Sequence, residues 1–308
     1  MKNIPSLIYI CLTVSVLNLF FFLFHSFPKE KNTLISSTGT SFTAIEPRTS
    51  DVFVPQKMDF AGENVPLHQP SVKEALQKEL IVNTYLHSHT LQILKKAPRV
   101  FSVLEPLLKK YNIPDDFKYL AVIESRLEPL IVSPAGAVGI WQFMKDTGKD
   151  LGLEINNEVD ERYHLEKATK AAADYLQKAY NKFNSWTLAA ASYNAGTSML
   201  TKQMQLQKES DYYNLLLGEE TERYVFRILA LKQIMTHPEL YHFEINETYP
   251  IEKTETIEVK KTVKDWADFA REHGITYKTL KRFNPWLRKN TLHNHHHKTY
   301  EIKIPVKK

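Results

Sequence analysis

Helical periodicity from Ser71 to Glu239 is the feature that most limits what this chain can fold into. Apolar residues recur three and four positions apart, and no strand-like alternation interrupts them. Ser71, followed three residues later by Glu74, predicts a capping box at the start of the first helix. The helices expected here cover residues 72–89, 99–111, 140–151, 165–183, 186–194 and 220–235, with a further helix that begins just after Pro114.

The composition fits a domain of moderate size with a small companion. The chain has 308 residues, of which 43% are hydrophobic, so it can bury a core. Its net charge of +5 suits an acidic polymer or an anionic membrane surface but requires neither. No block of Lys and Arg and no known motif points to nucleic acid, which is not expected as a partner.

The N-terminus is predicted to reach a membrane. Lys2 precedes an apolar stretch, Ile4–Phe27, that is long enough to span a bilayer. Bulky residues stand where a cleavable signal peptide needs small ones, so residues 1–28 are predicted to be an uncleaved signal anchor, with a cleaved signal peptide as the alternative. Cys11, the only cysteine, lies in this segment without a lipoprotein context, so no intramolecular disulfide is expected. Residues 29–70, rich in Ser, Thr, Pro and Lys, are predicted to be a flexible linker with a reach of roughly 35 Å.

The character of the chain changes after Pro250. Thr254–Lys260 and Tyr300–Pro305 alternate with period two, as half-buried strands do. Val263–His273 and Tyr277–Phe283 lie between them and have helical spacing. This order predicts a small βααβ module over residues 250–308.

Glu124 is the one acid in the apolar run at residues 119–125. Helical spacing places it on one inward stripe with Phe117, Leu120 and Ala121. Apolar surroundings and the negative end of a helix both disfavour the carboxylate, so its pKa should rise. A carboxyl still protonated near neutral pH can serve as a general acid. The alternative is a Glu at a frayed helix end that points to water.

Three further segments follow Glu124-Ser125 in order. Residues 133–144 contain Gly136, Gly139 and Gln142 in a G-x-x-G-x-x-Q pattern. Residues 191–196 read Ala-Ser-Tyr-Asn-Ala-Gly, and residues 220–225 read Glu-Thr-Glu-Arg-Tyr-Val. Together the four segments resemble the soluble lytic transglycosylase family, most closely its membrane-bound type D branch. The resemblance covers roughly residues 71–240.

This resemblance implies a mainly α fold with a lysozyme-like helical catalytic domain over residues 71–242. It makes Glu124 the single catalytic acid/base and places Tyr224 beside its carboxyl. Ser192 stands where the family usually has Ala, a change between small residues. The substrate-binding residues implied are Ser133, Gln142, Tyr193, Asn194 and Tyr224. Read without the family, Tyr224 is core packing, the two glycines mark a turn, and Gln142 faces solvent.

The implied activity is cleavage of the β-1,4 bond between N-acetylmuramic acid and N-acetylglucosamine in peptidoglycan, which leaves a 1,6-anhydro end. No metal or cofactor is implied. Most glycosidases use two carboxylates, about 5–9.5 Å apart. One acid suffices if the N-acetyl group and then the 6-hydroxyl of the substrate act as nucleophiles. Asp146 and Asp150 are weak candidates for a second acid. A hydrolytic muramidase and a non-catalytic peptidoglycan-binding protein of the envelope are the alternatives.

The C-terminal module resembles a LysM domain more loosely. The usual Gly-Asp opening of that family is replaced by Lys260–Val263, which leaves two roles open: glycan binding, or packing that braces the catalytic domain. Histidines 293 and 295–297 form either a metal site or a polar loop. The partners expected are glycan strands of peptidoglycan and a membrane, for a monomer in the bacterial cell envelope whose catalytic domain faces the periplasm.

Overall fold

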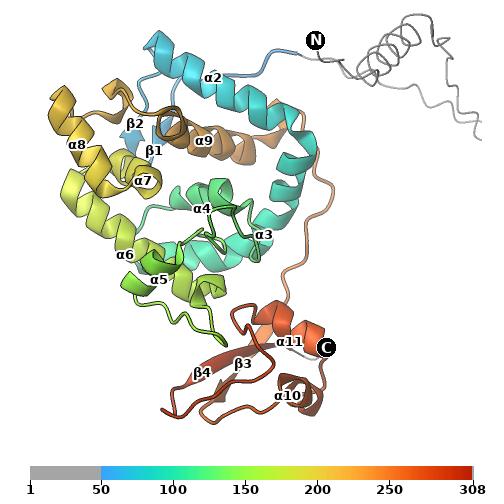
Figure 1. Cartoon of the computed structure of the whole chain (residues 1–308). Coiled ribbons are helices and arrows are strands. Elements are labelled where there is room, and N and C mark those ends of the chain that lie inside the picture. The colour runs from blue at the N-terminus through green and yellow to red at the C-terminus, as the bar shows by residue number, and fades with distance from the viewer. Residues whose placement is uncertain (1–49, 307–308) are drawn as a thin grey trace, which may run out of the picture. The chain divides into compact units, whose positions relative to one another are not determined.

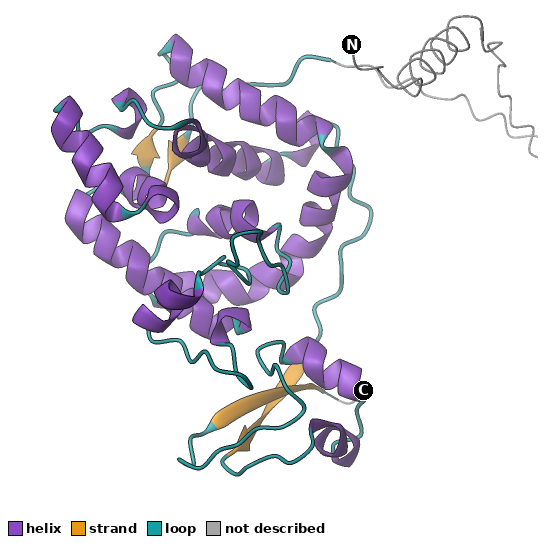
Figure 2. Cartoon of the chain, in the orientation of Figure 1, coloured by secondary structure: helices purple, strands orange, loops and turns teal. Residues whose placement is uncertain are grey.

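The structure of the protein, a computed structural model, describes residues 50–306 (Figure 1). Helices dominate this part of the chain, and the strands form two small sheets (Figure 2). The predicted anchor at residues 1–28 and the predicted linker as far as residue 49 lie outside the described residues. Within residues 50–306, no helix is both long enough and apolar enough to cross a bilayer.

The regular elements follow one another with short connections. The helices are α2 (Pro70–Tyr85), α3 (His87–Lys110), α4 (Phe117–Ser125), α5 (Lys145–Asp150), α6 (Leu165–Phe183), α7 (Trp186–Ala195), α8 (Thr197–Gln207), α9 (Glu219–Thr236), α10 (Trp266–Glu272) and α11 (Tyr277–Phe283). The short 3-10 helices are η1 (Glu161–Tyr163), η2 (Tyr212–Asn214) and η3 (Pro238–Tyr241). The strands are β1 (Asp59–Phe60), β2 (Glu63–Asn64), β3 (Thr254–Val259) and β4 (Tyr300–Pro305).

The first two helices differ from the prediction. α2 begins at Pro70, so Ser71 lies inside the helix and the predicted capping box is absent. Proline suits a first helical position, because the N–H it lacks would have no partner there. α3 continues through Pro98, where the sequence predicted a break. Its buried stripe, which includes Leu104 and Leu108, holds the helix in place despite the lost backbone hydrogen bond.

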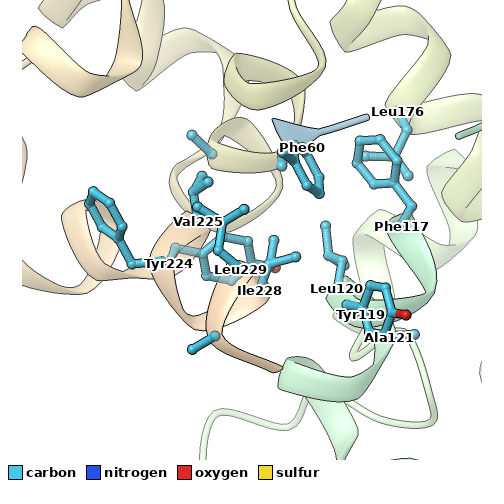
Figure 3. Close-up of a cluster of buried hydrophobic side chains, with 14 of the residues drawn as sticks. Phe60, Phe117, Tyr119, Leu120, Ala121, Leu176, Tyr224, Val225, Ile228 and Leu229 are labelled. Atoms are coloured by element: carbon cyan, nitrogen blue, oxygen red, sulfur yellow. The ribbon is translucent and has the colours of Figure 1, made fainter. Parts of the chain in front are cut away.

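The main hydrophobic core surrounds α4. Phe117 and Leu120 of α4 are fully buried, as are Ile228 and Leu229 of α9. Figure 3 shows these side chains within one cluster of buried residues. Burial of one large apolar side chain contributes about 1.5–3 kcal/mol, so this packing fixes α4 firmly. The last turn of α4, which carries Glu124, is therefore held in a defined position.

Residues 51–69 are folded, so the prediction of a linker is wrong over this stretch. β1 and β2 form a short antiparallel hairpin, and Phe60 is fully buried in the main core. The Glu63 carboxylate accepts hydrogen bonds from the Ser185 hydroxyl (2.9 Å) and the Thr187 N–H (2.9 Å) at the start of α7. The sequence hides this hairpin because its few apolar residues form no sustained period.

The C-terminal module has the predicted βααβ order. β3 and β4 pair antiparallel, with Thr254 opposite Pro305 and Val259 opposite Tyr300. The Asp265 carboxylate caps α10 by accepting the Ala267 N–H at 2.6 Å. A second hydrophobic core fills the module, and its fully buried members include Trp266, Ala270, Leu280 and Ile302.

Candidate active site

Glu124 occupies the last turn of α4, and the next residues fix how that helix ends. The hydroxyl of the buried Ser125 donates to the Ala121 carbonyl (2.9 Å) and accepts the Leu127 N–H (3.1 Å). Arg126 and Leu127 both have left-handed backbone angles, with φ of 52° and 57°. This sharp stop keeps Glu124 against the core instead of on a frayed end.

Tyr224 on α9 meets Glu124 directly. Its hydroxyl donates a short hydrogen bond to Oε1 of Glu124. Tyr224 is also almost fully buried and belongs to the main core, as Figure 3 shows. It therefore packs in the core and contacts the carboxyl as well, while the substrate contact predicted for it remains a prediction.

The surroundings of Glu124 raise the pKa of its carboxyl towards neutral pH, so a large share of it stays protonated there. Burial raises its pKa from 4.5 to about 7, against the hydrogen bond from Tyr224, which favours the carboxylate. The negative charge of Glu220 adds to the rise, and the positive charge of Arg227 opposes it. Arg227 lies three residues after Tyr224, near the same face of α9, so helical spacing from Tyr224 is the sequence signal that could have identified it.

Two further tyrosines line this neighbourhood. The Tyr193 hydroxyl donates to the Trp141 carbonyl at 2.7 Å, and the charge of Glu124 adds to the rise in the pKa of Tyr193 that burial causes. The Tyr175 ring stands edge-on to Tyr193, with centroids 5.3 Å apart, and its hydroxyl donates to the Ser192 carbonyl at 2.6 Å. Tyr175 lies on α6 outside the four motifs, so nothing in the local sequence singled it out.

Asn194 links the end of α7 to the start of α9. Its side-chain oxygen accepts the Thr221 hydroxyl at 2.9 Å, and its side-chain nitrogen donates to Glu220 at 3.3 Å. Glu220 itself is exposed. Asn194 thus orients the acid whose charge raises the pKa of Glu124.

Ser133 and Gln142 make their hydrogen bonds inside their own loop. The Ser133 hydroxyl accepts the Ala137 N–H at 3.0 Å. Gln142 has a left-handed backbone (φ 48°), and its side chain donates to the Gly139 carbonyl at 2.8 Å. These contacts shape the loop at residues 131–143, and the substrate contacts predicted for both residues remain predictions.

Gly139 is required by close packing as well as by its turn. Its φ is 78°, a conformation that residues with a Cβ rarely adopt. A Cβ atom here would lie 2.2 Å from the carbonyl oxygen of Arg162. Gly136 has open space around it, so its φ of 88° is its only constraint. The two glycines of the motif therefore differ in what they do.

No metal centre is found in the part of the chain that the structure describes, since no three His, Cys, Asp or Glu side chains there gather as ligands. His293, the first of the clustered histidines, instead contacts the Glu158 carboxylate through Nδ1 at 2.9 Å. This histidine serves a contact between the module and the helical domain.

Comparison with known proteins matches two segments of the chain to domain families. Residues 103–216 match the transglycosylase SLT domain family. Residues 103–216 therefore form a domain of the transglycosylase SLT family. Residues 255–308 match the LysM-like domain found at the C-terminus of soluble lytic transglycosylases. The predicted family, the mainly α lysozyme-like fold and the LysM-like module are thereby confirmed.

Several named relatives share this similarity. Membrane-bound lytic murein transglycosylase D of Escherichia coli K12 is 30% identical over 241 residues, which are 76% of this chain and 52% of that protein. Peptidoglycan transglycosylase gp16 of Escherichia phage T7 is 34% identical over 118 residues, which are 37% of this chain and 9% of that protein. The chain spans about half the length of the first of these relatives.

Solved structures of lytic transglycosylases were also matched. The crystal structure of the 70 kDa soluble lytic transglycosylase of Escherichia coli is 22% identical to this chain, with a TM-score of 0.39. The match covers 53% of this chain and 30% of that structure. The family assignment rests on the sequence matches.

Proposed function

We propose that this protein is a peptidoglycan lytic transglycosylase in which Glu124 is the single acid/base. The observation that carries the proposal is the partly buried Glu124 carboxyl, with its pKa near 7 and the Tyr224 hydroxyl on its oxygen. A group with this pKa is protonated often enough to donate a proton and basic enough to take one back. The match to the transglycosylase SLT domain family supports the same activity.

The chemistry needs one carboxyl in two roles. Protonated Glu124 donates its proton to the bridging oxygen while the bond from that oxygen to C1 of N-acetylmuramic acid breaks. The N-acetyl oxygen of the same sugar attacks C1 and holds it as a covalent intermediate. Glu124, now a carboxylate, removes the 6-hydroxyl proton, and O6 displaces the N-acetyl oxygen from C1. The 1,6-anhydro ring closes, and Glu124 regains its proton.

Tyr224 and Arg227 serve the middle of this cycle. Both favour the charged form of Glu124, one by a hydrogen bond and one by its charge. They stabilise the carboxylate that exists between the two proton transfers. Ser133 and Gln142 are proposed to contact the glycan from the 131–143 loop, and Tyr193 and Asn194 from the end of α7.

A hydrolytic muramidase is the competing activity, because water could replace the 6-hydroxyl. Two-carboxylate hydrolysis needs a second acid held beside the substrate. Glu220 is exposed and engaged by Asn194, and Asp146 and Asp150 are exposed on α5. Of these acids only Glu220 affects Glu124, through its charge, and its side chain is exposed and hydrogen-bonded to Asn194, so the anhydro product is favoured.

Product mass tests the proposal directly. Purified peptidoglycan is digested with the wild-type protein, and the released fragments are analysed by mass spectrometry. Anhydro ends one water lighter than reducing ends are expected. Reducing ends alone would establish the muramidase instead, and no release by folded protein would favour a glycan-binding role.

We propose further that the protein acts in the bacterial cell envelope, as a monomer held by residues 1–28 with its catalytic domain in the periplasm. The span-length apolar run and the membrane-bound relative support this location. Peptide mass mapping of the mature protein tests it. A mature N-terminus near residues 28–31 would show a cleaved signal peptide in place of an anchor.

A further inference from the structure

Residues 154–166, here called the bridging segment, contact both the 131–143 loop and the C-terminal module. The loop carries Ser133 and Gln142, two of the residues proposed to contact the glycan. From Asp51 onward the chain forms one compact unit, so the module is not a separate body on a free tether. The contacts on the two sides of the bridging segment show how the module reaches the loop.

Arg162 makes the contact on the loop side. One guanidinium nitrogen donates to the carbonyls of Phe143 (3.1 Å) and Gly136 (3.4 Å). The Phe143 carbonyl also accepts the Val138 N–H at 3.1 Å, so Arg162 joins the hydrogen bonds that close the loop. The guanidinium is almost fully buried and paired with Asp160, at 3.0 Å and 2.7 Å.

The module holds the same segment from the other side by its backbone. The Asp160 N–H donates to the Trp286 carbonyl at 2.9 Å, and the Arg288 N–H donates to the Glu158 carbonyl at 2.7 Å. Between them, Val159 is fully buried in the core of the module. The backbone of Asp160 therefore binds the module, and the side chain of Asp160 binds Arg162.

Side chains extend this contact along the bridging segment. The Trp286 ring stacks between His164 and Tyr300, with centroid distances of 5.4 Å and 5.9 Å. The Arg288 guanidinium lies over the Tyr163 ring at 4.3 Å.

Charges on the two surfaces are complementary. Acids of the bridging segment face bases of the module, in the pairs Glu154–Lys298, Glu158–His293 and Glu166–Lys303. Even Val138, at the middle of the loop, is buried in the core cluster of the module. These contacts favour the bracing role for the module over a separate tethered binder.

We propose that Arg162 is a positioning residue that holds the 131–143 loop in its glycan-binding form, and that the C-terminal module sets Arg162 through Asp160 and Val159. The module thus tunes the affinity for glycan through the 131–143 loop. This inference rests on the proposed function, because it takes glycan as the ligand of the loop.

Arg162→Lys in the full-length chain is the sharpest variant. Lysine keeps a cation beside Asp160, so no buried charge is left unpaired. It lacks the fork that reaches Asp160 and the loop carbonyls together. The KM for solubilised glycan strands should rise about tenfold, the value of one charge-assisted hydrogen bond, with little change in kcat. The pH profile should stay fixed, because the Glu124 carboxyl is untouched.

Glu158→Ala tests the module side. Its carboxylate accepts bonds from the Thr291 hydroxyl, from the His293 N–H (2.8 Å) and from the His293 ring. The KM should rise, and the double variant with Arg162→Lys should match Arg162→Lys alone, because both act through one contact. Asp268→Ala removes an exposed ion pair inside the module and should leave the KM unchanged.

Binding in a Glu124→Gln background separates this inference from the proposed function. Pelleting with purified peptidoglycan gives the affinity without cleavage. Weaker binding with Arg162→Lys, and with Glu158→Ala, supports the positioning role. Binding equal to that of the parent in both variants overturns it, as does a multiplicative effect in the double variant. Cleavage by Glu124→Gln itself would instead refute the proposed function.

Discussion

Two carboxyls in this protein, Glu124 in the site and Glu166 at the module, are shifted in opposite directions. Burial raises the pKa of both. At Glu124 burial prevails and the pKa reaches about 7, because its hydrogen-bond donor is the neutral Tyr224 hydroxyl. At Glu166 the His164 ring and the Lys303 ammonium prevail, and the pKa falls to about 2. An acid removed from water keeps a raised pKa, suited to proton transfer, where no cation touches it. Where cations do touch it, its pKa falls and the ion pairs stabilise the fold.

The largest expected effect is on catalysis at Glu124. Glu124→Gln should lower glycan release by at least about a hundredfold, the lower range for loss of a general acid/base. The amide is nearly the same size and can still accept the Tyr224 hydroxyl, so the fold should survive. Release of anhydro fragments is measured by mass spectrometry, with circular dichroism as the check on folding. Residual activity near that of the wild type would contradict the contrast between the two carboxyls, because Glu124 would then not be the reactive acid.

The pH profile comes next in size. Glu124 must be protonated to start the reaction, so kcat/KM should fall about tenfold per pH unit above a pKa near 7. Tyr224→Phe removes a hydrogen bond that favours the carboxylate, so this alkaline limb, the fall in kcat/KM, should move to higher pH by about one unit. Glu220→Gln removes a charge that raises the pKa and should move the limb downward by roughly a few tenths of a unit.

Glu222→Gln is the matched control for this pair. It changes another exposed acid in the first turn of α9, and its charge does not contribute to the shift at Glu124. Its profile should overlay that of the wild type. Movement of the limb in the same direction by Tyr224→Phe and Glu220→Gln would contradict the assignment of the titration to Glu124.

Much of this comparison follows from sequence periodicity and motif order. The stripe of α4 with Glu124 and the βααβ module were predicted because their apolar spacing is regular over whole elements. Tyr224 was placed beside the acid by the motif around it. The hairpin at residues 51–69 and the passage of α3 through Pro98 were missed, because tertiary burial there overrides local signals.

Residues that act across long separations stayed hidden. Arg162 bonds carbonyls 19 and 26 residues earlier in the chain, and Tyr175 bonds the Ser192 carbonyl 17 residues later. Glu166 and Lys303 are 137 residues apart. A sequence pattern records spacing within an element, and these contacts depend on how separate elements pack.

The free energy of unfolding should depend on pH through Glu166, and the lowered pKa of Glu166 sets the sign of that dependence. The pKa of Glu166 is 4.5 in the unfolded chain and about 2 in the folded protein. Its ion pairs therefore stabilise the protein fully above pH 4.5. That contribution is lost as the pH falls from 4.5 towards 2. Glu166→Gln should therefore lower the free energy of unfolding by about 1–3 kcal/mol at pH 7 and by less at pH 3. Urea unfolding at both pH values measures this, with the exposed Asp174→Asn as the control. Equal losses at the two pH values would mean that packing, and not charge, is the cause.

The pH dependence of stability that comes from Glu124 has the opposite sign. Its folded pKa lies near 7 and its unfolded value near 4.5, so the folded state binds more protons between these values. Stability therefore decreases as the pH rises from 4.5 to 7, because the partly buried carboxyl resists ionisation in the folded state while the unfolded chain ionises freely. Glu124→Gln cannot ionise, so it should be more stable than the wild type at pH 8, by up to about 3 kcal/mol, and close to it at pH 4. Thermal unfolding at both pH values measures the difference. A variant that is less stable than the wild type at pH 8 would show that the carboxylate is well solvated in its site, and the contrast with Glu166 would then no longer hold.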